Sequence, residues 1–246
     1  TEVTLKEKYA NIILIGNEQQ ILENASNNNI DIKGAKIIEP KTSENYEKYA
    51  NLLYELRKNK GITIEKAKEI ALDPVYFGML MVKDEETKVD GLVSGAIHST
   101  ADTLRPALQI LKTAPDTKLV SAFFVMVVPE CNYGENGTFI FGDCGLNSNP
   151  TAEELSEIAI SSSKSFTQLV GKEPKVAMLS YSTYGSANSS LTEKVIEATK
   201  ILKEKEPNLK ADGELQVDSA IIPEVAKSKA PESNVAGEAN VLIFPD

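Results

Sequence analysis

The sequence VDGLVSGAIHSTADTLRPALQIL occupies Val89–Leu111, and we expect the rest of the chain to be organised around it. The pattern predicts a strand (VDGLVSG), a loop of small and hydroxyl residues at Ala96–Thr100, and a helix from Leu104 onward. At such a junction the free backbone N–H groups and the positive end of the helix dipole point to the same place, which favours anions. An ordinary capped turn is the alternative interpretation.

Arginine usage supports the anion-site interpretation. The chain has 26 Lys+Arg residues, of which two, Arg57 and Arg105, are arginines. An arginine in a lysine-rich background suggests a site that needs a planar, bidentate donor for phosphate or carboxylate. Pro106 favours a helix that starts near Thr103, with Arg105 in its first turn, because proline is tolerated there. The alternative is a helix that starts near Ser99 and kinks at Pro106.

Composition limits the classes of function. The chain has 246 residues, 41% hydrophobic and 25% charged, with a formal net charge of -10. The negative charge argues against a nucleic-acid partner bound by bulk electrostatics. No apolar run approaches the length of a membrane span, so we expect no membrane partner. Two cysteines, Cys131 and Cys144, do not suggest a disulfide framework, and we therefore expect a reducing cytoplasm.

The order of predicted elements indicates an α/β fold with a largely parallel sheet. A β-hairpin formed by residues 119–128 and 138–143 adds antiparallel pairing to the second half. The polar segment 113–118 suggests a boundary between a first α/β domain, residues 1–115, and a second, residues 116–246. Other expected strands are 11–16, 35–38, 89–95, 175–180 and 240–244, and expected helices are 18–26, 45–59, 63–72, 150–170, 191–206 and part of 215–229.

Small-residue loops follow a predicted strand in each half, at 96–100 and 181–190, which suggests a ligand cleft between the halves. Several other sites lack support. No GxGxxG, GxxxxGK[ST] or GxSxG motif is present, which argues against dinucleotide, P-loop and nucleophile-elbow sites. A single histidine and two cysteines thirteen residues apart are poor zinc ligands, so we expect no metal. Asp143 and Asp218 are better read as capping or solvated carboxylates.

Four blocks together carry a family resemblance, and they follow one another along nearly the whole chain. The chain resembles phosphate acetyltransferase (phosphotransacetylase), of the phosphate acetyl/butyryltransferase family. Phosphate butyryltransferase is the closest alternative, and the blocks DGELQVDSA and VVPECNYG favour the acetyl enzyme. The four blocks are SGAIHSTADTLRPALQI (Ser94–Ile110), VVPECNYGENGTFIFGDC (Val127–Cys144), KVAMLSYSTYGSA (Lys175–Ala187) and DGELQVDSA (Asp212–Ala220).

The resemblance implies an acyltransferase of acetate metabolism that moves acetyl reversibly between acetyl-CoA and phosphate, giving acetyl phosphate and coenzyme A. Coenzyme A is then a substrate, and no bound cofactor is expected. The implied fold has the two domains of isocitrate and isopropylmalate dehydrogenases, with the site in the interdomain cleft. A cytoplasmic homodimer is implied as well.

The resemblance also assigns residues. Arg57 and Arg105 match the cleft arginines of the family and are our candidate catalytic residues. We expect Arg105 to hold phosphoryl oxygens and Arg57 to hold phosphate or a phosphate of coenzyme A. The candidate substrate-binding residues are Ser99, Thr100, Ser182, Gly185 and Cys131, of which Cys131 lies near the site without being the nucleophile.

Two parts of the family pattern have no match between Thr1 and Asp246. One is an N-terminal strand with an LPEG-like motif. The other is a C-terminal segment that carries a Ser-Arg pair and an Asp, which is thought to take the thiol proton of coenzyme A. We expect these catalytic residues beyond Asp246 and an incomplete first domain. A truncated, non-catalytic fragment that binds ligand or dimerises is therefore a further alternative.

Overall fold

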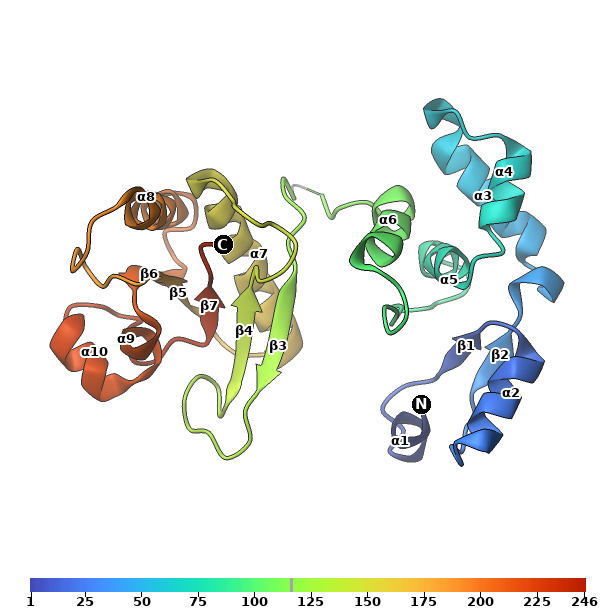
Figure 1. The fold of residues 1–246 in the computed structure, drawn as a ribbon, viewed down its shortest axis with the longest axis horizontal. Helices are drawn as coiled ribbons and strands as arrows, with labels where there is room; N and C mark the ends of the chain where they lie inside the picture. The colour runs from blue at the N-terminus through green and yellow to red at the C-terminus, as the bar shows by residue number, and fades with distance from the viewer. Residues whose placement is uncertain (116) are drawn as a thin grey trace. The chain divides into compact units, whose positions relative to one another are not determined.

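The computed structural model describes residues 1–115 and 117–246 and divides the chain into two compact units (Figure 1). Unit 1 is Thr1–Ala114 and unit 2 is Pro115–Asp246. Asp116, the first residue of the predicted second domain, lies outside the described residues. Each unit has its own sheet and its own buried core.

Unit 1 has two short parallel strands, and the rest of its regular structure is helical. Strand β1 (Ile13–Ile15) pairs with β2 (Lys36–Ile38), and Ile13 lies opposite Lys36. The helices are α1 (Glu2–Lys6), α2 (Glu18–Asn27), α3 (Tyr46–Arg57), α4 (Ile64–Ile70), α5 (Pro74–Lys83) and α6 (Thr100–Ile110), with 3-10 turns at Pro40–Thr42 and Lys58–Lys60.

The core of unit 1 forms where α3, α5 and α6 pack together. Leu53, Leu80 and Ile110 are fully buried in it. The rings of Tyr49 and Phe77 meet edge to face, with their centroids 5.0 Å apart. Each fully buried side chain of this size contributes about 1.5–3 kcal/mol, so this packing fixes the relative positions of the three helices.

Local capping explains where α5 begins. The apolar segment 76–82, ambiguous between helix and strand in the sequence, is part of this helix. The Asp73 carboxylate accepts the backbone N–H groups of Val75 at 2.9 Å and Tyr76 at 3.1 Å, and Pro74 occupies the first helical position. Both features favour a helix start, and they decide the ambiguity.

The predicted strand at 89–95 is wrong. These residues form no regular secondary structure, and α6 begins at Thr100 with Ser99 as its N-cap, which confirms the alternative start rather than the one near Thr103. Leu92 packs against α5 so closely that its Cδ1 lies 2.7 Å from where a Cβ on Gly78 would stand. A helix surface offers no free backbone groups to a neighbouring strand, and the segment therefore stays irregular.

Unit 2 contains a mixed five-stranded sheet with the order β3-β4-β7-β5-β6. Strands β3 and β4 form the predicted antiparallel hairpin, and the other neighbours are parallel. The strands are β3 (Phe123–Val127), β4 (Thr138–Gly142), β5 (Lys175–Leu179), β6 (Lys210–Leu215) and β7 (Val241–Ile243), and the helices are α7 (Ala152–Val170), α8 (Ser190–Lys205), α9 (Val217–Ile221) and α10 (Pro223–Lys229).

Helices cover both faces of this sheet (Figure 1). Val176 and Met178 of β5 point into a core shared with α7 and α8, whereas Ala177 and Leu179 point into a core shared with α9 and α10. Alternate residues of a strand face opposite sides, so a strand covered on both faces reads as a continuous apolar run. This explains why the sequence predicts β5 well.

The start of α7 also follows the prediction. The Thr151 hydroxyl accepts the N–H of Glu154 at 3.2 Å, and the Glu154 carboxylate accepts the N–H of Thr151 at 2.9 Å. This is a capping box, which the three-residue spacing of Thr151 and Glu154 favours. Strand β6, by contrast, was not expected, because its sequence KADGEL places charged residues where a buried strand usually has apolar ones.

Candidate active site

The N-terminus of α6 holds three of the predicted site residues. The Ser99 hydroxyl caps the helix by accepting the N–H of Asp102 at 3.2 Å, and it also donates to the Asp102 carboxylate at 2.6 Å. Thr100, the first helical residue, is exposed. The Arg105 guanidinium lies 3.6 Å from the same carboxylate, and 57% of its side chain is exposed. Arg105 is therefore open to a ligand.

Asp102 is a site residue that the sequence analysis missed. The hydrogen bond from Ser99 lowers the pKa of the Asp102 carboxyl, and the charge of Arg105 lowers it further. The carboxylate is therefore ionised at neutral pH and stands beside the predicted anion site. Its spacing of three residues from both Ser99 and Arg105 is the signal that could have found it, because such side chains lie on one helix face.

Arg57 ends α3, and it shares a neighbour with Arg105. That neighbour is the phenol of Tyr76, in the first turn of α5. Burial raises the pKa of the Tyr76 phenol, and the positive charges of Arg105 and Arg57 oppose that rise. The Tyr76 hydroxyl donates to Gln109 of α6 at 3.0 Å, which ties α5 to the helix that carries Arg105. The charges of the two arginines of the chain thus both act on one side chain of unit 1, Tyr76.

In unit 2, the loop that follows the carboxyl end of β5 carries Ser182 and Gly185. Gly185 has a φ of +80°, a conformation that favours glycine, and its N–H donates to Glu214 at 2.8 Å. Ser182 is fully buried, and its hydroxyl donates to the same carboxylate at 2.8 Å. The Ser182 hydroxyl therefore shapes the loop instead of lying open to a ligand, whereas Gly185 is exposed.

Cys131 lies elsewhere. It occupies the turn between β3 and β4, at the amino ends of the parallel strands, whereas Ser182 and Gly185 follow the carboxyl end of β5. The length of the sheet separates them, so Cys131 does not share a subsite with these two residues of its own chain. The reason is topological. The hairpin turn leads into the start of β4, so it must lie at the end of the sheet where the parallel strands begin.

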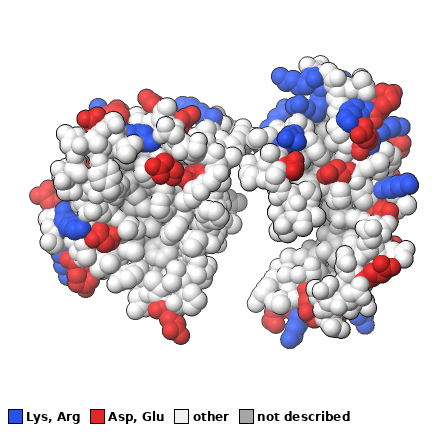
Figure 2. Space-filling view, viewed as in Figure 1, with Lys and Arg blue, Asp and Glu red and all other residues white. Residues whose placement is uncertain are grey.

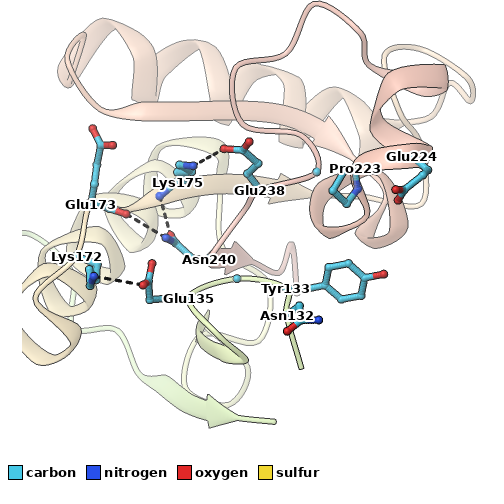
Figure 3. A pocket seen from close by; sticks show the side chains of 12 residues that line it. Asn132, Tyr133, Glu135, Lys172, Glu173, Lys175, Pro223, Glu224, Glu238 and Asn240 are labelled. Atoms are coloured by element: carbon cyan, nitrogen blue, oxygen red, sulfur yellow. Dashed lines mark hydrogen bonds and ion pairs between the residues drawn. The ribbon is translucent and has the colours of Figure 1, made fainter. Parts of the chain in front are cut away.

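A pocket of about 600 Å³ adjoins Cys131 at these amino ends (Figure 3). Both of its lysines form ion pairs within the lining, Lys172 with Glu135 at 3.5 Å and Lys175 with Glu238. No predicted site residue lines it. It is lined by Asn132, Tyr133, Gly134, Glu135, Lys172, Glu173, Lys175, Pro223, Glu224, Gly237, Glu238 and Asn240.

Asp143, at the carboxyl end of β4, is a capping residue, as predicted. Its buried carboxylate accepts the N–H groups of Ala122, Gly145 and Leu146 and the side-chain amide of Asn147. Within residues 1–115 and 117–246, no group of three or more His, Cys, Asp or Glu side chains could hold a metal ion. None of the helices described there is long and apolar enough to cross a membrane.

Comparison with known proteins identifies the family. The family model described as phosphate acetyl/butaryl transferase matches residues 1–246. The chain belongs to this family. Among members of the phosphate acetyl/butaryl transferase family, the phosphate acetyltransferase of Acetivibrio thermocellus is 64% identical over 98% of this chain and 72% of its own length. That of Thermoanaerobacterium thermosaccharolyticum is 57% identical over 100% of this chain and 74% of its own length.

Solved structures of the phosphate acetyl/butaryl transferase family agree. The EutD phosphotransacetylase from Staphylococcus aureus matches with a TM-score of 0.82 and 42% identity, over 97% of this chain and 70% of that chain. A phosphotransacetylase from Streptococcus pyogenes matches with a TM-score of 0.79 and 41% identity, over 94% of this chain and 68% of that chain. The predicted phosphate acetyltransferase, an acyltransferase with a mixed α/β fold, is confirmed.

Proposed function

We propose that the chain transfers acetyl reversibly between coenzyme A and phosphate (acetyl-CoA + phosphate ⇌ coenzyme A + acetyl phosphate), and that unit 1 binds the phosphoryl group. The observation that carries this assignment is the exposed Arg105 guanidinium in α6, whose N-terminal turn also presents the exposed Thr100. A phosphate at this helix start would meet a guanidinium group that can donate two parallel hydrogen bonds.

Arg105 is the principal phosphate ligand in this proposal. When the thiolate of coenzyme A attacks the acetyl carbonyl of acetyl phosphate, a thioester C–S bond forms, the C–O bond to phosphate breaks, and phosphate leaves with the electron pair. Negative charge therefore grows on the phosphoryl oxygens, and a cation held in place there stabilises the transition state. The exposed hydroxyl of Thr100 and the N-terminal N–H groups of α6 are the neighbouring donors. Ser99 contributes by capping that helix.

Arg57 is the second phosphate ligand. It lies at the C-terminus of α3, where the partial negative charge of the helix end stabilises a guanidinium group. We assign to it free phosphate or a phosphate of coenzyme A. Within unit 2, Gly185 is the candidate substrate-binding residue, because it is exposed beyond the carboxyl end of β5.

The test is a coupled assay on the purified full-length protein. Acetyl-CoA and phosphate should give free thiol and acetyl phosphate in equal amounts, and the reverse reaction should consume both. Butyryl-CoA in the same assay addresses the alternative acyl group, for which we expect a lower kcat/KM. Thiol release that does not depend on phosphate would contradict the proposal.

A homodimer is part of the proposal. Phe124, Val125 and Met126 of the edge strand β3 are 54%, 47% and 37% exposed, and Figure 2 shows an area without charged side chains over this hairpin. A second copy is the partner we assign. Two uncharged β3 edges can pair antiparallel without like-charge repulsion, although the chain as a whole carries a net charge of -10.

The proposal also includes a two-domain architecture and a cytoplasmic location. The division into two units supports the two-domain organisation of isocitrate and isopropylmalate dehydrogenases. Cys131 and Cys144 are both free thiols, which supports a reducing, cytoplasmic location.

A further inference from the structure

Strand β6 carries two buried carboxylates, Asp212 and Glu214, whose exposed fractions are 6% and 3%. Burial of an ionised carboxylate destabilises the folded state unless hydrogen bonds or an opposite charge compensate for it. Both residues accept hydrogen bonds from one neighbouring segment, the loop after β5, and Asp212 also pairs with Lys203 of α8. The loop comprises residues 181–190, and we call it the β5 loop.

Asp212 forms an ordinary ion pair with Lys203. Lys203 donates to its carboxylate at 2.8 Å, and the Tyr184 hydroxyl donates to its second oxygen. Burial alone would raise the pKa of Asp212, but these hydrogen bonds outweigh it and the pKa is lowered. The ion pair with Lys203 stabilises the fold, and this structural role is enough to explain a buried carboxylate at position 212.

Glu214 differs, because its side-chain partners are neutral donors of the β5 loop. One oxygen, Oε1, accepts both the Ser182 hydroxyl and the Gly185 N–H at 2.8 Å. The Ser182 hydroxyl in turn accepts the N–H of Ala187 at 3.0 Å, and the Glu214 carbonyl accepts the N–H of Tyr184 at 3.3 Å. Among the described residues, no lysine or arginine forms an ion pair with Glu214.

These contacts divide the β5 loop into an anchored side and an open side. Ser182 and Thr183 are buried, whereas Gly185, Ser186 and Asn188 are exposed. The anchored side fixes the backbone from which the open side projects, next to the N-terminus of the sixteen-residue helix α8. A buried carboxylate that binds only loop donors is thus suited to fixing a loop conformation.

We propose that Glu214 is a positioning residue, which holds the β5 loop so that its open side can bind a phosphoryl group of a substrate. This inference rests on the proposed phosphate acetyltransferase reaction and adds a residue that does not itself touch substrate. The phosphoryl group belongs to acetyl phosphate or to coenzyme A, and the KM values of the two substrates distinguish these sources.

The test compares Glu214→Gln with the wild-type full-length protein. Glutamine keeps an oxygen acceptor but loses the charge, and a charge-assisted hydrogen bond is roughly twice as strong as a neutral one, so we expect one KM to rise about five- to tenfold with a smaller change in kcat. The control is Glu224→Gln, the same chemical change at an exposed position, which should leave both KM values unchanged. Glu214→Leu removes the acceptor and should raise the same KM further.

Ser182→Ala supplies a second line of evidence that does not depend on the folding of the leucine variant. Because Ser182 and Glu214 share one hydrogen bond, the double variant with Glu214→Gln should raise KM by less than the product of the single effects. Unchanged KM values in Glu214→Gln, or fully multiplicative effects, would overturn the positioning role while the proposed reaction stands. A wild-type protein without acetyl transfer would instead remove the proposed reaction, and the role of Glu214 with it.

Discussion

Replacement of Arg105 by lysine separates the two properties that the proposed site requires, positive charge and the planar fork. Arg105 projects from α6 with 57% of its side chain exposed, and its partner in the structure, Asp102, lies 3.6 Å away. A lysine at this position keeps the charge and can still reach Asp102. What it loses is the second parallel hydrogen bond to a phosphoryl group.

The magnitude follows from that one bond. A charge-assisted hydrogen bond contributes about 1.5–3 kcal/mol, and the half-exposed position of Arg105 places the expected loss at the lower end. Because about 1.4 kcal/mol corresponds to a factor of ten, Arg105→Lys should raise the KM for acetyl phosphate about tenfold. Arg105→Gln removes the charge as well and should raise it at least another fivefold or so.

Steady-state kinetics in the direction from acetyl phosphate to acetyl-CoA measure both effects. The KM for coenzyme A and the midpoint of thermal unfolding serve as controls. The midpoint should not move, because an exposed i,i+3 ion pair contributes about 0.5 kcal/mol or less. If Arg105→Lys matches the wild type in both KM for acetyl phosphate and kcat, Arg105 does not bind phosphate through its fork.

Four further outcomes are expected. Asp102→Asn removes a negative charge beside the phosphate site and should lower the KM for acetyl phosphate about threefold in low salt, with a smaller effect at high salt. Thr151→Ala removes half of the capping box of α7 and should lower the free energy of unfolding by about 1 kcal/mol, measured by urea titration. Although burial raises the pKa of Asp143, its hydrogen bonds lower the pKa overall from the ordinary value of 3.8. Its carboxylate therefore stabilises the fold above that value, and this stabilisation is lost as the pH falls through the lower folded pKa, so Asp143→Asn should flatten the acid limb of a stability–pH curve. Phe124→Lys places a charge on the β3 edge and should convert a dimer to a monomer in sedimentation, whereas Lys118→Gln should not.

Short-range patterns in the sequence determined much of the fold. The capping box of Thr151 with Glu154 is complete within about four residues, so the sequence shows it without any tertiary information. The continuous apolar run of β5 predicts a buried strand, because this pattern too is contained in a few consecutive residues. The arginine count singled out Arg57 and Arg105, and their role in binding phosphate stays a prediction.

Tertiary structure decided the features that depend on distant partners. Strand β6 forms because its Asp212 and Glu214 find donors 28 to 32 residues earlier in the chain, and nothing in KADGEL shows this. The same contacts bury Ser182, which the sequence presented as an open hydroxyl. Residues 89–95 form no strand, and Leu92 among them packs against α5. Cys131 lies at the opposite end of the sheet from Ser182. A sequence shows which residues can cap, alternate or carry charge, but long-range packing alone decides which groups are buried and which face a ligand.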